Sequence, residues 1–438
     1  MQIKHQPYKG VRDFYPEDWR LQAYIFKVWA EVAESYGYER YDASVLEYLE
    51  LYRLKSQGNS EILNEQIYSF VDRGQRQVAL RPEMTPTVAR MIAARRQELG
   101  AAPIRWYSIP NVFRYERPQK GRLREHWQLN VDCFGVPPSE AELELILIAC
   151  DVLKRFKAAP NMYVIKLSSR RLLEDIFRDQ LGLNRVQIES LFLLFDRHDK
   201  MGKTAFGEAC RQLLPPEGAS RRKGFAKLQD LINCQDLTEL PADVQDLPSA
   251  RQLGQLLGDL RVAGITNAVL DFKIVRGFDY YTDIVFEIFD QEADNRRSMF
   301  GGGRYDGLLE SLGVEPLSGA GFGMGDVTTA DFLAAHRLLP AFKPAADICV
   351  ILLEDAPYIK VLPVLRSLRA EGFNPVVDNR PAKAAKKIEA AVKRRIEHAL
   401  FIGPADLEEE RFNLKHLPSG KEDRLSLARV ISRLAERK

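Results

Sequence analysis

Polar and apolar side chains alternate between residues 124 and 134. Side chains on a β-strand point by turns to its two faces, so this stretch has one polar and one apolar face. The polar face carries His126, Gln128, Asn130 and Asp132. The pattern alone fits either a binding surface or an ordinary sheet with one solvated face, and both interpretations stay open at this point.

The loop before this strand favours a binding surface. Residues 114–125 hold five Arg and Lys against two Glu, a net charge of +3, and include Lys120. Guanidinium groups match phosphate oxygens geometrically, so cations above a polar sheet face suit a polyphosphate. The usual nucleotide motifs are not the explanation. Arg197 stands where a P-loop ending in MGKT needs glycine, and GAGFGMG (319–325) does not fit GxGxxG.

Composition excludes several protein classes. The 438 residues contain 63 Lys and Arg against 61 Asp and Glu, a formal charge of +2, unlike a disordered acidic or basic chain. Five cysteines lie far apart without a CxxC pair, and no HExxH occurs, so neither a disulfide framework nor a zinc site is expected. No run approaches the ~18 apolar residues of a membrane span, and the start does not resemble a signal peptide. We therefore expect a soluble cytoplasmic protein with no membrane partner and no protein-bound metal.

Hydrophobic spacing predicts the main elements. Helices are expected at 19–36, 86–99 and 139–157, and strands at 77–81, 105–116 and 124–134. Residues 168–268 are mostly helical, and strand patterns lie on both sides of them. This arrangement predicts a helical insertion between two parts of one body, 1–167 and 269–337. After a linker at 338–345, strands alternate with helices over 346–438, which predicts an α/β domain with a mostly parallel sheet.

Several long motifs resemble the signature blocks of histidyl-tRNA synthetases, a class II aminoacyl-tRNA synthetase family. They are RPEMTPT (81–87), FRYERPQKGRLREHWQLNVDCFG (113–135), VRGFDYYTDIVFE (275–287) and GGGRYDGL (301–308). The resemblance covers essentially the whole chain in the expected order. It implies an α+β catalytic domain, with an antiparallel sheet flanked by helices and interrupted by the insertion. It also implies a C-terminal anticodon-binding α/β domain and a homodimer that pairs through motif 1.

The resemblance implies a two-step reaction. Histidine and ATP form histidyl-adenylate and pyrophosphate, and the 3′ end of tRNA(His) then takes the histidyl group. Arg114 matches the arginine that holds the α-phosphate, and Arg276 matches the one between this phosphate and the substrate carboxylate. Both are therefore the expected catalytic residues. Mg²⁺ is expected on the outer phosphates. The positions that match ATP-binding residues of the family are Arg114, Glu116, Arg122, His126 and Thr328.

The same resemblance implies a polar histidine pocket. Glu83, Thr85 and Gln128 match positions that hold the α-ammonium group. Asp132 and Tyr281 match those that bind the imidazole. A carboxylate opposite a ring N–H, together with a phenol, can recognise both ring nitrogens. The remaining expected histidine-binding positions are Arg276, Tyr280 and Tyr305.

Two regions are expected to touch tRNA. Residues 380–395 carry seven cations and one anion, and a helix there would place a cationic stripe beside an apolar one. The stripe is either a solvated helix face or, in an anticodon-binding domain, a phosphate contact. Its expected members are Lys383, Lys386, Lys387, Lys393 and Arg394. Arg117 and Gln119 match family positions near the extra 5′ guanine of histidine tRNAs.

The chain departs from the family pattern at three positions. Thr328 stands where motif 3 has an arginine, Ser44 replaces the motif 1 proline, and His126 replaces the aromatic expected on adenine. Two alternatives to a ligase therefore remain. One is a regulatory subunit of ATP phosphoribosyltransferase, which lacks the anticodon-binding domain. The other is a histidine-sensing or tRNA-binding module without chemistry, which the threonine would favour.

Overall fold

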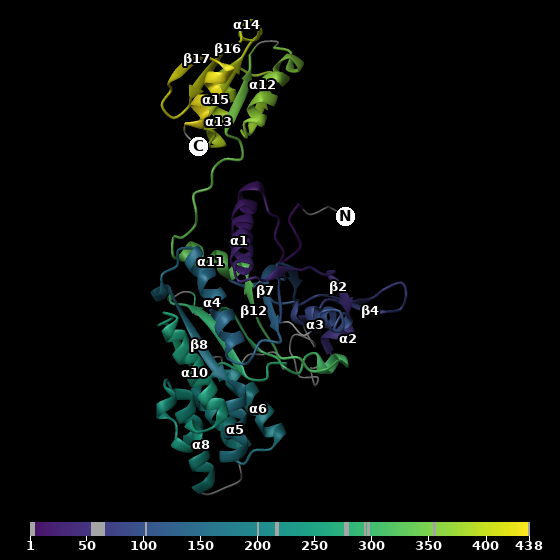
Figure 1. Ribbon diagram of the computed structural model, residues 1–438, viewed down its shortest axis with the longest axis vertical. Coiled ribbons are helices and arrows are strands. Elements are labelled where there is room, and N and C mark those ends of the chain that lie inside the picture. Colours follow the sequence, from purple (N-terminus) through teal and green to yellow (C-terminus); the bar gives the residue numbers. More distant parts are fainter. Residues whose placement is uncertain are drawn as a thin grey trace. The chain divides into compact units, whose positions relative to one another are not determined.

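The computed structural model describes residues 5–53, 66–100, 103–198, 201–214, 219–275, 280–292, 295, 298–353 and 356–436, except the side chains of 203 and 219–221. The chain forms two compact units, 1–339 and 340–438, joined by the segment that Figure 1 draws between them. Each unit is described by itself.

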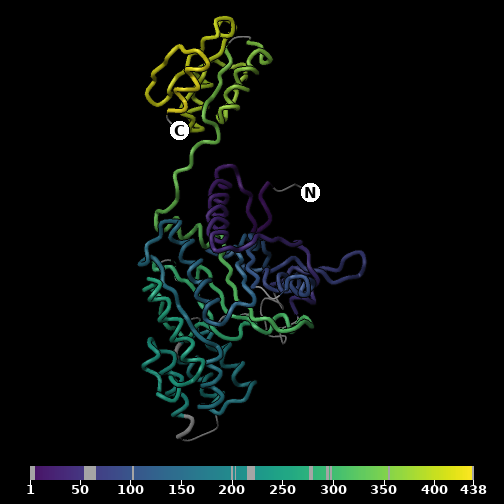
Figure 2. The backbone as a smooth tube through the Cα atoms, in the orientation of Figure 1, coloured from purple at the N-terminus to yellow at the C-terminus, as the bar shows by residue number. Residues whose placement is uncertain are grey.

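A large sheet forms the centre of the first unit. Within the described residues it has nine strands in the order β1-β5-β7-β12-β11-β10-β8-β9, with β6 beside β7. The strands are β1 (Glu39–Arg40), β5 (Ile104–Ser108), β6 (Asn111–Phe113), β7 (Glu125–Phe134), β8 (Tyr163–Ser169), β9 (Ala268–Leu270), β10 (Ile284–Asp290), β11 (Ser298–Arg304) and β12 (Gly319–Gly325). Neighbours are antiparallel except at the β1–β5 and β8–β9 edges. Strands far apart in the sequence, such as β7 and β12, therefore lie side by side (Figure 2).

Three helices cover the apolar face of this sheet: α1 (Pro16–Ser35), α4 (Glu140–Arg155) and α11 (Asp326–Ala335). Pro16 starts α1 because its fixed φ suits the first helical position. Ser139 and Glu142 form a capping box at the start of α4. The buried side chains of α1, such as Trp29, pack on the apolar residues of β7 that the alternation predicts. The helices expected at 19–36 and 139–157 and the strand at 124–134 are confirmed.

A small sheet in the order β2-β4-β3 lies next in the chain. Its elements and the helices beside it are β2 (Leu46–Tyr48), α2 (Leu49–Arg53), β3 (Ser69–Val71), β4 (Gln77–Leu80) and α3 (Thr85–Ala94). One face of this sheet leaves Leu46, Tyr48 and Phe70 about half exposed, at 48%, 53% and 50%. Exposed apolar side chains gathered on one sheet face are typical of an interaction surface.

Helices dominate the segment between β8 and β9. They are α5 (Arg170–Asp175), α6 (Arg185–Asp196), α7 (Lys203–Leu213), α8 (Ala219–Asn233), α9 (Ala242–Gln245) and α10 (Pro248–Val262). Their buried side chains, including Phe195 and Leu253, belong to the same apolar cluster as the large sheet. The boundaries at 168 and 268 therefore stay predictions, because this core continues from the sheet into the helices.

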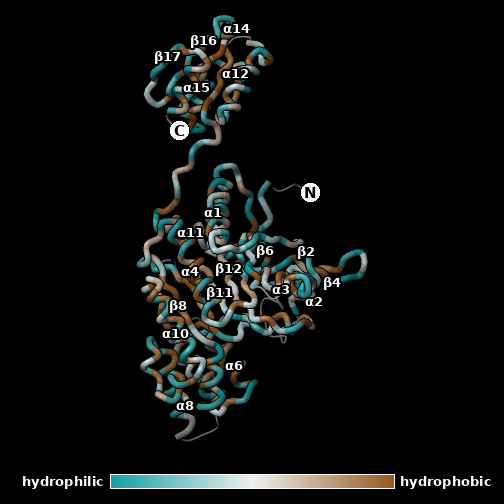
Figure 3. Tube along the Cα trace, viewed as in Figure 1, coloured by the Kyte–Doolittle hydropathy of each residue, from teal (hydrophilic) through white to brown (hydrophobic). Residues whose placement is uncertain are grey.

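The second unit has a five-stranded sheet in the order β14-β13-β15-β16-β17. Its elements are β13 (Ile348–Leu352), α12 (Tyr358–Ala370), β14 (Pro375–Asp378), α13 (Ala384–Lys393), β15 (His398–Ile402), α14 (Pro404–Glu408), β16 (Arg411–His416), β17 (Glu422–Ser426) and α15 (Leu427–Ala435). The first three strands in this order are parallel, whereas β16 and β17 are antiparallel, so the sheet is mixed rather than mostly parallel. Apolar residues concentrate in the interior of this unit (Figure 3), above all on β13 and β15, which are buried along their whole length. Among the described helices of both units, none has the length and apolar character that a membrane crossing requires.

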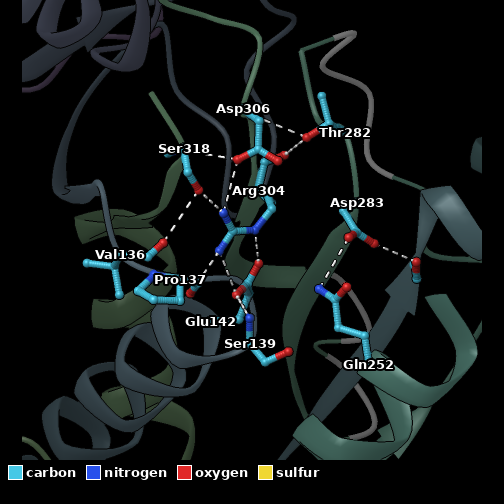
Figure 4. Close-up of polar contacts among 12 residues, drawn as sticks. Val136, Pro137, Ser139, Glu142, Gln252, Thr282, Asp283, Arg304, Asp306 and Ser318 are labelled. Atoms are coloured by element: carbon cyan, nitrogen blue, oxygen red, sulfur yellow. Dashed lines mark hydrogen bonds and ion pairs between the residues drawn. The ribbon is translucent and has the colours of Figure 1, made fainter. Parts of the chain in front are cut away.

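A buried arginine joins the start of α4 to the end of β11 (Figure 4). The Arg304 side chain is 1% exposed, and its guanidinium donates to both carboxylate oxygens of Glu142 at 2.5 and 2.9 Å. It also donates to Asp306 at 3.0 Å and to the Ser318 hydroxyl. A buried ion pair tolerates desolvation only when such additional hydrogen bonds complete it. The network therefore holds the backbone on both sides of Tyr305 in one geometry.

Breaking this pair should destabilise the first unit. Arg304→Met leaves Glu142 as an unpaired buried charge, which typically costs about 3–5 kcal/mol of unfolding free energy. Urea denaturation of the variant measures the loss. The double variant Arg304→Met/Glu142→Leu should recover part of it, because no buried charge remains. Equal loss in the single and double variants would contradict this explanation.

Candidate active site

Glycines on β12 lie directly beside polar side chains of β7. Gly321 lies directly opposite Asp132 across the β12–β7 pair, and Gly323 lies opposite Asn130. A Cβ at Gly321 would lie 2.4 Å from the Tyr305 hydroxyl, and one at Gly323 would lie 2.3 Å from the Gln128 amide nitrogen. These glycine-rich segments therefore provide room for side chains from β7.

Asp132 is buried beside these glycines. It is 1% exposed, and its Oδ1 accepts a hydrogen bond of 2.5 Å from the Tyr305 hydroxyl. Its Oδ2 has no hydrogen-bond partner among the described residues. The pKa of Asp132 is raised to about 7, mainly by burial and also by the nearby charge of Glu83. The hydrogen bond from Tyr305 opposes this rise. A buried carboxylate oxygen without a partner is a site for an N–H donor of a ligand.

Glu83 is the second carboxylate of this site. Its Oε2 accepts a hydrogen bond of 2.8 Å from the Tyr280 hydroxyl. Burial raises the pKa of Glu83 to about 7, while the hydrogen bond from Tyr280 and the charge of Arg114 oppose this shift. The Arg114 Nε donates to the Pro82 carbonyl at 2.9 Å, which holds this guanidinium beside the carboxylate. The site thus combines two carboxylates with a cation.

Tyrosine rings lie beside these carboxylates. The Tyr280 ring centroid lies 4.9 Å from that of Tyr281 and 5.8 Å from that of Tyr305. Thr85, the first residue of α3, interacts through its hydroxyl with the Tyr280 phenol. The structure therefore brings together seven described residues of the predicted histidine site: Glu83, Thr85, Gln128, Asp132, Tyr280, Tyr281 and Tyr305. Arg276, the remaining predicted member, lies outside the described residues.

Two polar residues of this face were not predicted from the sequence. Ser108 lies opposite Asn130 in the β5–β7 pair, so its side chain points to the polar face. The negative charge of Asp132 is one of the groups that raise the pKa of Tyr41, after burial itself. Both hydroxyls are buried, and the Ser108 hydroxyl, close to that of Tyr41, opposes the rise in the Tyr41 pKa. Strand alternation was a signal for Ser108, whereas Tyr41 follows a two-residue strand and has none.

His126 occupies the other end of the polar face. The pKa of His126 is lowered to about 3, mainly by burial and also by the positive charges of Arg114 and Arg12. The imidazole is therefore neutral at pH 7. A neutral ring can pack against a purine base without the cost of burying its own charge.

The remaining predicted ATP residues are engaged with the protein. Thr328 donates its hydroxyl to the Met299 carbonyl at 2.8 Å. Arg122 forms an ion pair of 3.2 Å with Glu116, and about half of the arginine side chain stays exposed. Thr328 thus supplies no charge, and the Arg122–Glu116 pair is nearly neutral as a unit.

The expected tRNA contacts are exposed with one exception. Arg117 and Gln119 are exposed in the loop before β7, and Lys383, Lys386, Lys393 and Arg394 are exposed on and beside α13. Lys387 is instead 4% exposed, and its ammonium group donates to the Leu352 carbonyl at 2.6 Å. The prediction of Lys387 as a tRNA contact is therefore wrong. Its helical position faces the sheet, where a backbone carbonyl satisfies the charge.

Comparison with known proteins agrees with the geometry. Residues 10–325 match the model of the family described as histidyl-tRNA synthetase, and residues 347–437 match that described as anticodon binding domain. The chain belongs to the histidyl-tRNA synthetase family. It is an enzyme with histidine–tRNA ligase activity and carries an anticodon-binding domain, which disfavours the regulatory-subunit alternative.

Individual relatives span the whole chain. The histidine–tRNA ligase of Leptospira biflexa is 40% identical over 430 residues, 98% of this chain and 97% of that protein. The chloroplastic/mitochondrial histidine–tRNA ligase of Arabidopsis thaliana is 33% identical over 97% of this chain and 86% of that protein. The crystal structure of histidyl-tRNA synthetase from Nostoc sp. PCC 7120 superposes with a TM-score of 0.80, at 22% identity and full coverage of both chains. This last likeness supports the α+β fold.

The raised pKa of Asp132 predicts a pH-dependent cost to stability. A carboxyl whose folded pKa is about 7, against roughly 4 when unfolded, stabilises the fold below pH 4 and loses this contribution as pH rises through 7. Asp132→Asn cannot ionise, so the ligand-free variant should be more stable than the natural chain at pH 8, by up to about 4 kcal/mol, and by only about 1.4 kcal/mol at pH 5. Urea unfolding at both pH values measures the difference.

A surface carboxylate provides the control for this experiment. Asp72 lies partly exposed at the surface, and hydrogen bonds from Arg76 lower its pKa, so Asp72→Asn should show no gain at pH 8. Stability of Asp132→Asn that parallels the natural chain across this pH range would contradict the buried, proton-accepting state of Asp132.

Proposed function

We propose that histidine binds above Asp132 and Glu83 and that ATP binds along the polar face of β7 toward His126. The observation that carries this proposal is the unsatisfied Oδ2 of Asp132, close to a second buried carboxylate, Glu83, which itself lies beside Arg114. An imidazole N–H would satisfy Oδ2, and an ammonium group would satisfy Glu83. Amino acids without an imidazole would leave Asp132 unpaired, which typically reduces reaction by ~10⁴–10⁵-fold.

The proposed first step joins histidine to AMP. A carboxylate oxygen of histidine attacks the α-phosphorus, a new P–O bond forms, and the bond to the bridging oxygen of the β-phosphate breaks. Pyrophosphate leaves with that electron pair. Arg114 lies beside Glu83 and is placed to hold the α-phosphate, and we assign Arg276 to the approach of the two anions. Their positive charges offset the repulsion between carboxylate and phosphate.

In the proposed second step a ribose hydroxyl at the 3′ end of tRNA(His) attacks the activated carbonyl carbon, and AMP leaves. The exposed Arg117 and Gln119 lie in the loop that precedes β7, and we assign them to the end of the acceptor stem. The exposed cations of α13 are assigned to phosphates of the anticodon arm, which suits a matched anticodon-binding domain.

Mg²⁺ is proposed to arrive with ATP. The described residues hold no cluster of three His, Cys, Asp or Glu side chains able to bind a metal ion. The ion would therefore be held mainly by the outer phosphates, where it neutralises their charge.

Removal of the α-phosphate cation tests the catalytic assignment. Arg114→Ala should lower kcat for histidine-dependent exchange of labelled pyrophosphate into ATP by about 10²-fold or more. Arg185→Ala, which removes an exposed arginine of the helical segment, is the control and should exchange normally. Full activity of Arg114→Ala would remove this residue from the mechanism.

Exposed cations of α13 give a separate test. The double variant Lys383→Ala/Lys386→Ala should weaken tRNA binding and reduce the slope of log K against log salt concentration by about 2, because two phosphate contacts are lost. Pyrophosphate exchange should be unchanged. Filter binding across a salt series measures the slope. Lys387→Met is the matched comparison, since Lys387 is buried and should change the stability of the second unit without changing the slope. An unaltered slope in the double variant would exclude these lysines as phosphate contacts.

The protein is further proposed to act as a homodimer. The exposed apolar face of the β2-β4-β3 sheet, with Leu46, Tyr48 and Phe70, begins two residues after Ser44, the position that matches the motif 1 proline. Apolar faces of this kind are usually covered in an assembly. The proposed compartment is the cytoplasm, because the five cysteines are free and buried, which suits a reducing environment.

A further inference from the structure

Binding of ATP requires positive charge near its outer phosphates, and the position that the family uses for it is neutral here. Thr328 stands in place of the motif 3 arginine, and its hydroxyl donates to the backbone. Arg122 is paired with Glu116, while Arg124 donates to the Tyr8 hydroxyl and packs on the Tyr115 ring. Other parts of the described structure must therefore be considered.

Arg12 reaches this region from the N-terminal segment. Its Nη2 donates to the Asp326 carboxylate at 2.7 Å, and Asp326 is fully buried at the start of α11. The same carboxylate accepts hydrogen bonds from the Gln22 amide at 2.8 Å and from the Trp127 backbone N–H at 3.0 Å. Asp326, which precedes Thr328 by two residues, thus holds the Arg12 guanidinium in place.

The Arg12 guanidinium keeps donors for a ligand. A guanidinium has five N–H groups, and Asp326 accepts at Nη2. The Arg12 Nε is buried and has no hydrogen-bond partner among the described residues. The Gln22 amide and the Trp127 backbone N–H also donate to this carboxylate, so Asp326 holds the Arg12 guanidinium through one nitrogen only and leaves its other N–H groups for a ligand. A buried N–H without a partner is unfavourable until an acceptor arrives.

Arg12 also lies near His126, which we assigned to the ATP site. Its charge acts on His126, whose pKa is lowered by burial, by Arg114 and by Arg12. A Cβ at Gly325, the residue before Asp326, would lie 3.4 Å from the Thr328 hydroxyl oxygen and 4.0 Å from a His126 ring carbon. Arg12, His126 and Thr328 therefore surround the same turn between β12 and α11.

We propose that Arg12 is a further catalytic residue of adenylation, which binds the outer phosphates of ATP in place of the absent motif 3 arginine. The proposal rests on the ATP site assigned above. No bond to Arg12 forms or breaks: its guanidinium donates hydrogen bonds to phosphate oxygens and stabilises the negative charge that pyrophosphate gains as it leaves. An arginine carried by the N-terminal segment would thus do the work of one carried by α11.

Steady-state pyrophosphate exchange tests this role. Arg12→Gln should raise KM for ATP about 10-fold or more, or lower kcat by a similar factor, and leave KM for histidine unchanged. Lys27→Gln removes an exposed cation of α1 and is the control, expected to match the natural chain. An unchanged kcat and KM for ATP in Arg12→Gln would overturn the proposal.

A second pair of variants separates catalysis from structure. Arg12→Gln leaves Asp326 without its cation, so any effect could come from that buried carboxylate. Arg12→Gln/Asp326→Asn removes both charges, and a merely structural arginine would then regain normal kinetics for ATP. The proposal instead predicts that the double variant stays impaired toward ATP. Recovery of normal ATP kinetics in the double variant would overturn it.

Rescue at the family position completes the test. Arg12→Gln/Thr328→Arg should recover ATP kinetics by 5-fold or more, because the charge returns to the same turn; no recovery would contradict the stated equivalence of the two positions. The underlying ATP site is judged separately. If Arg114→Ala is impaired and Arg12→Gln is normal, only the proposed role of Arg12 is contradicted. If Arg114→Ala is normal, the proposed ATP site itself is contradicted.

Discussion

Two carboxylates buried in one site constrain the catalytic unit more than any other feature. The pKa values of Asp132 and Glu83 are both raised to about 7, because each charge loses its hydration on burial; the charge of Glu83 also contributes to the rise at Asp132. Each is held by one tyrosine hydroxyl, from Tyr305 and Tyr280. The folded protein thus tolerates a polar arrangement that costs stability until a ligand with N–H donors fills it.

The scaffold gives this site its space and its rigidity. Glycines at 321 and 323 leave the space that Tyr305 and Gln128 occupy. The buried ion pair with Glu142 fixes Arg304, the residue before Tyr305. This ion pair therefore helps to orient the Tyr305 phenol. Arg304, which forms the structural ion pair, and Tyr305, which donates to Asp132 in the site, are therefore neighbours in the sequence with separate roles.

Local environment decides what each cation of this chain can do. Lys387 has the sequence context of an RNA contact, yet it is buried against the Leu352 carbonyl. Lys383 and Lys386, on the same basic segment, are exposed. Arg12 is the reverse case. Its sequence context does not indicate a ligand contact, yet its ion pair with Asp326 places it at the turn beside His126. Cation function follows from which groups pack around the side chain, and net charge does not reveal it.

Sequence alone determined the features that depend on local periodicity. Alternation along 124–134 placed Gln128 and Asp132 on one face, because side-chain direction in a strand follows from neighbouring residues. Motif resemblance selected most of the site residues and the family. Tertiary structure decided the rest: the mixed second sheet, the hydrogen bond between Tyr305 and Asp132 across 173 residues, and the burial of Lys387. Desolvation and long-range pairing depend on which distant segments pack together, and no local pattern encodes them.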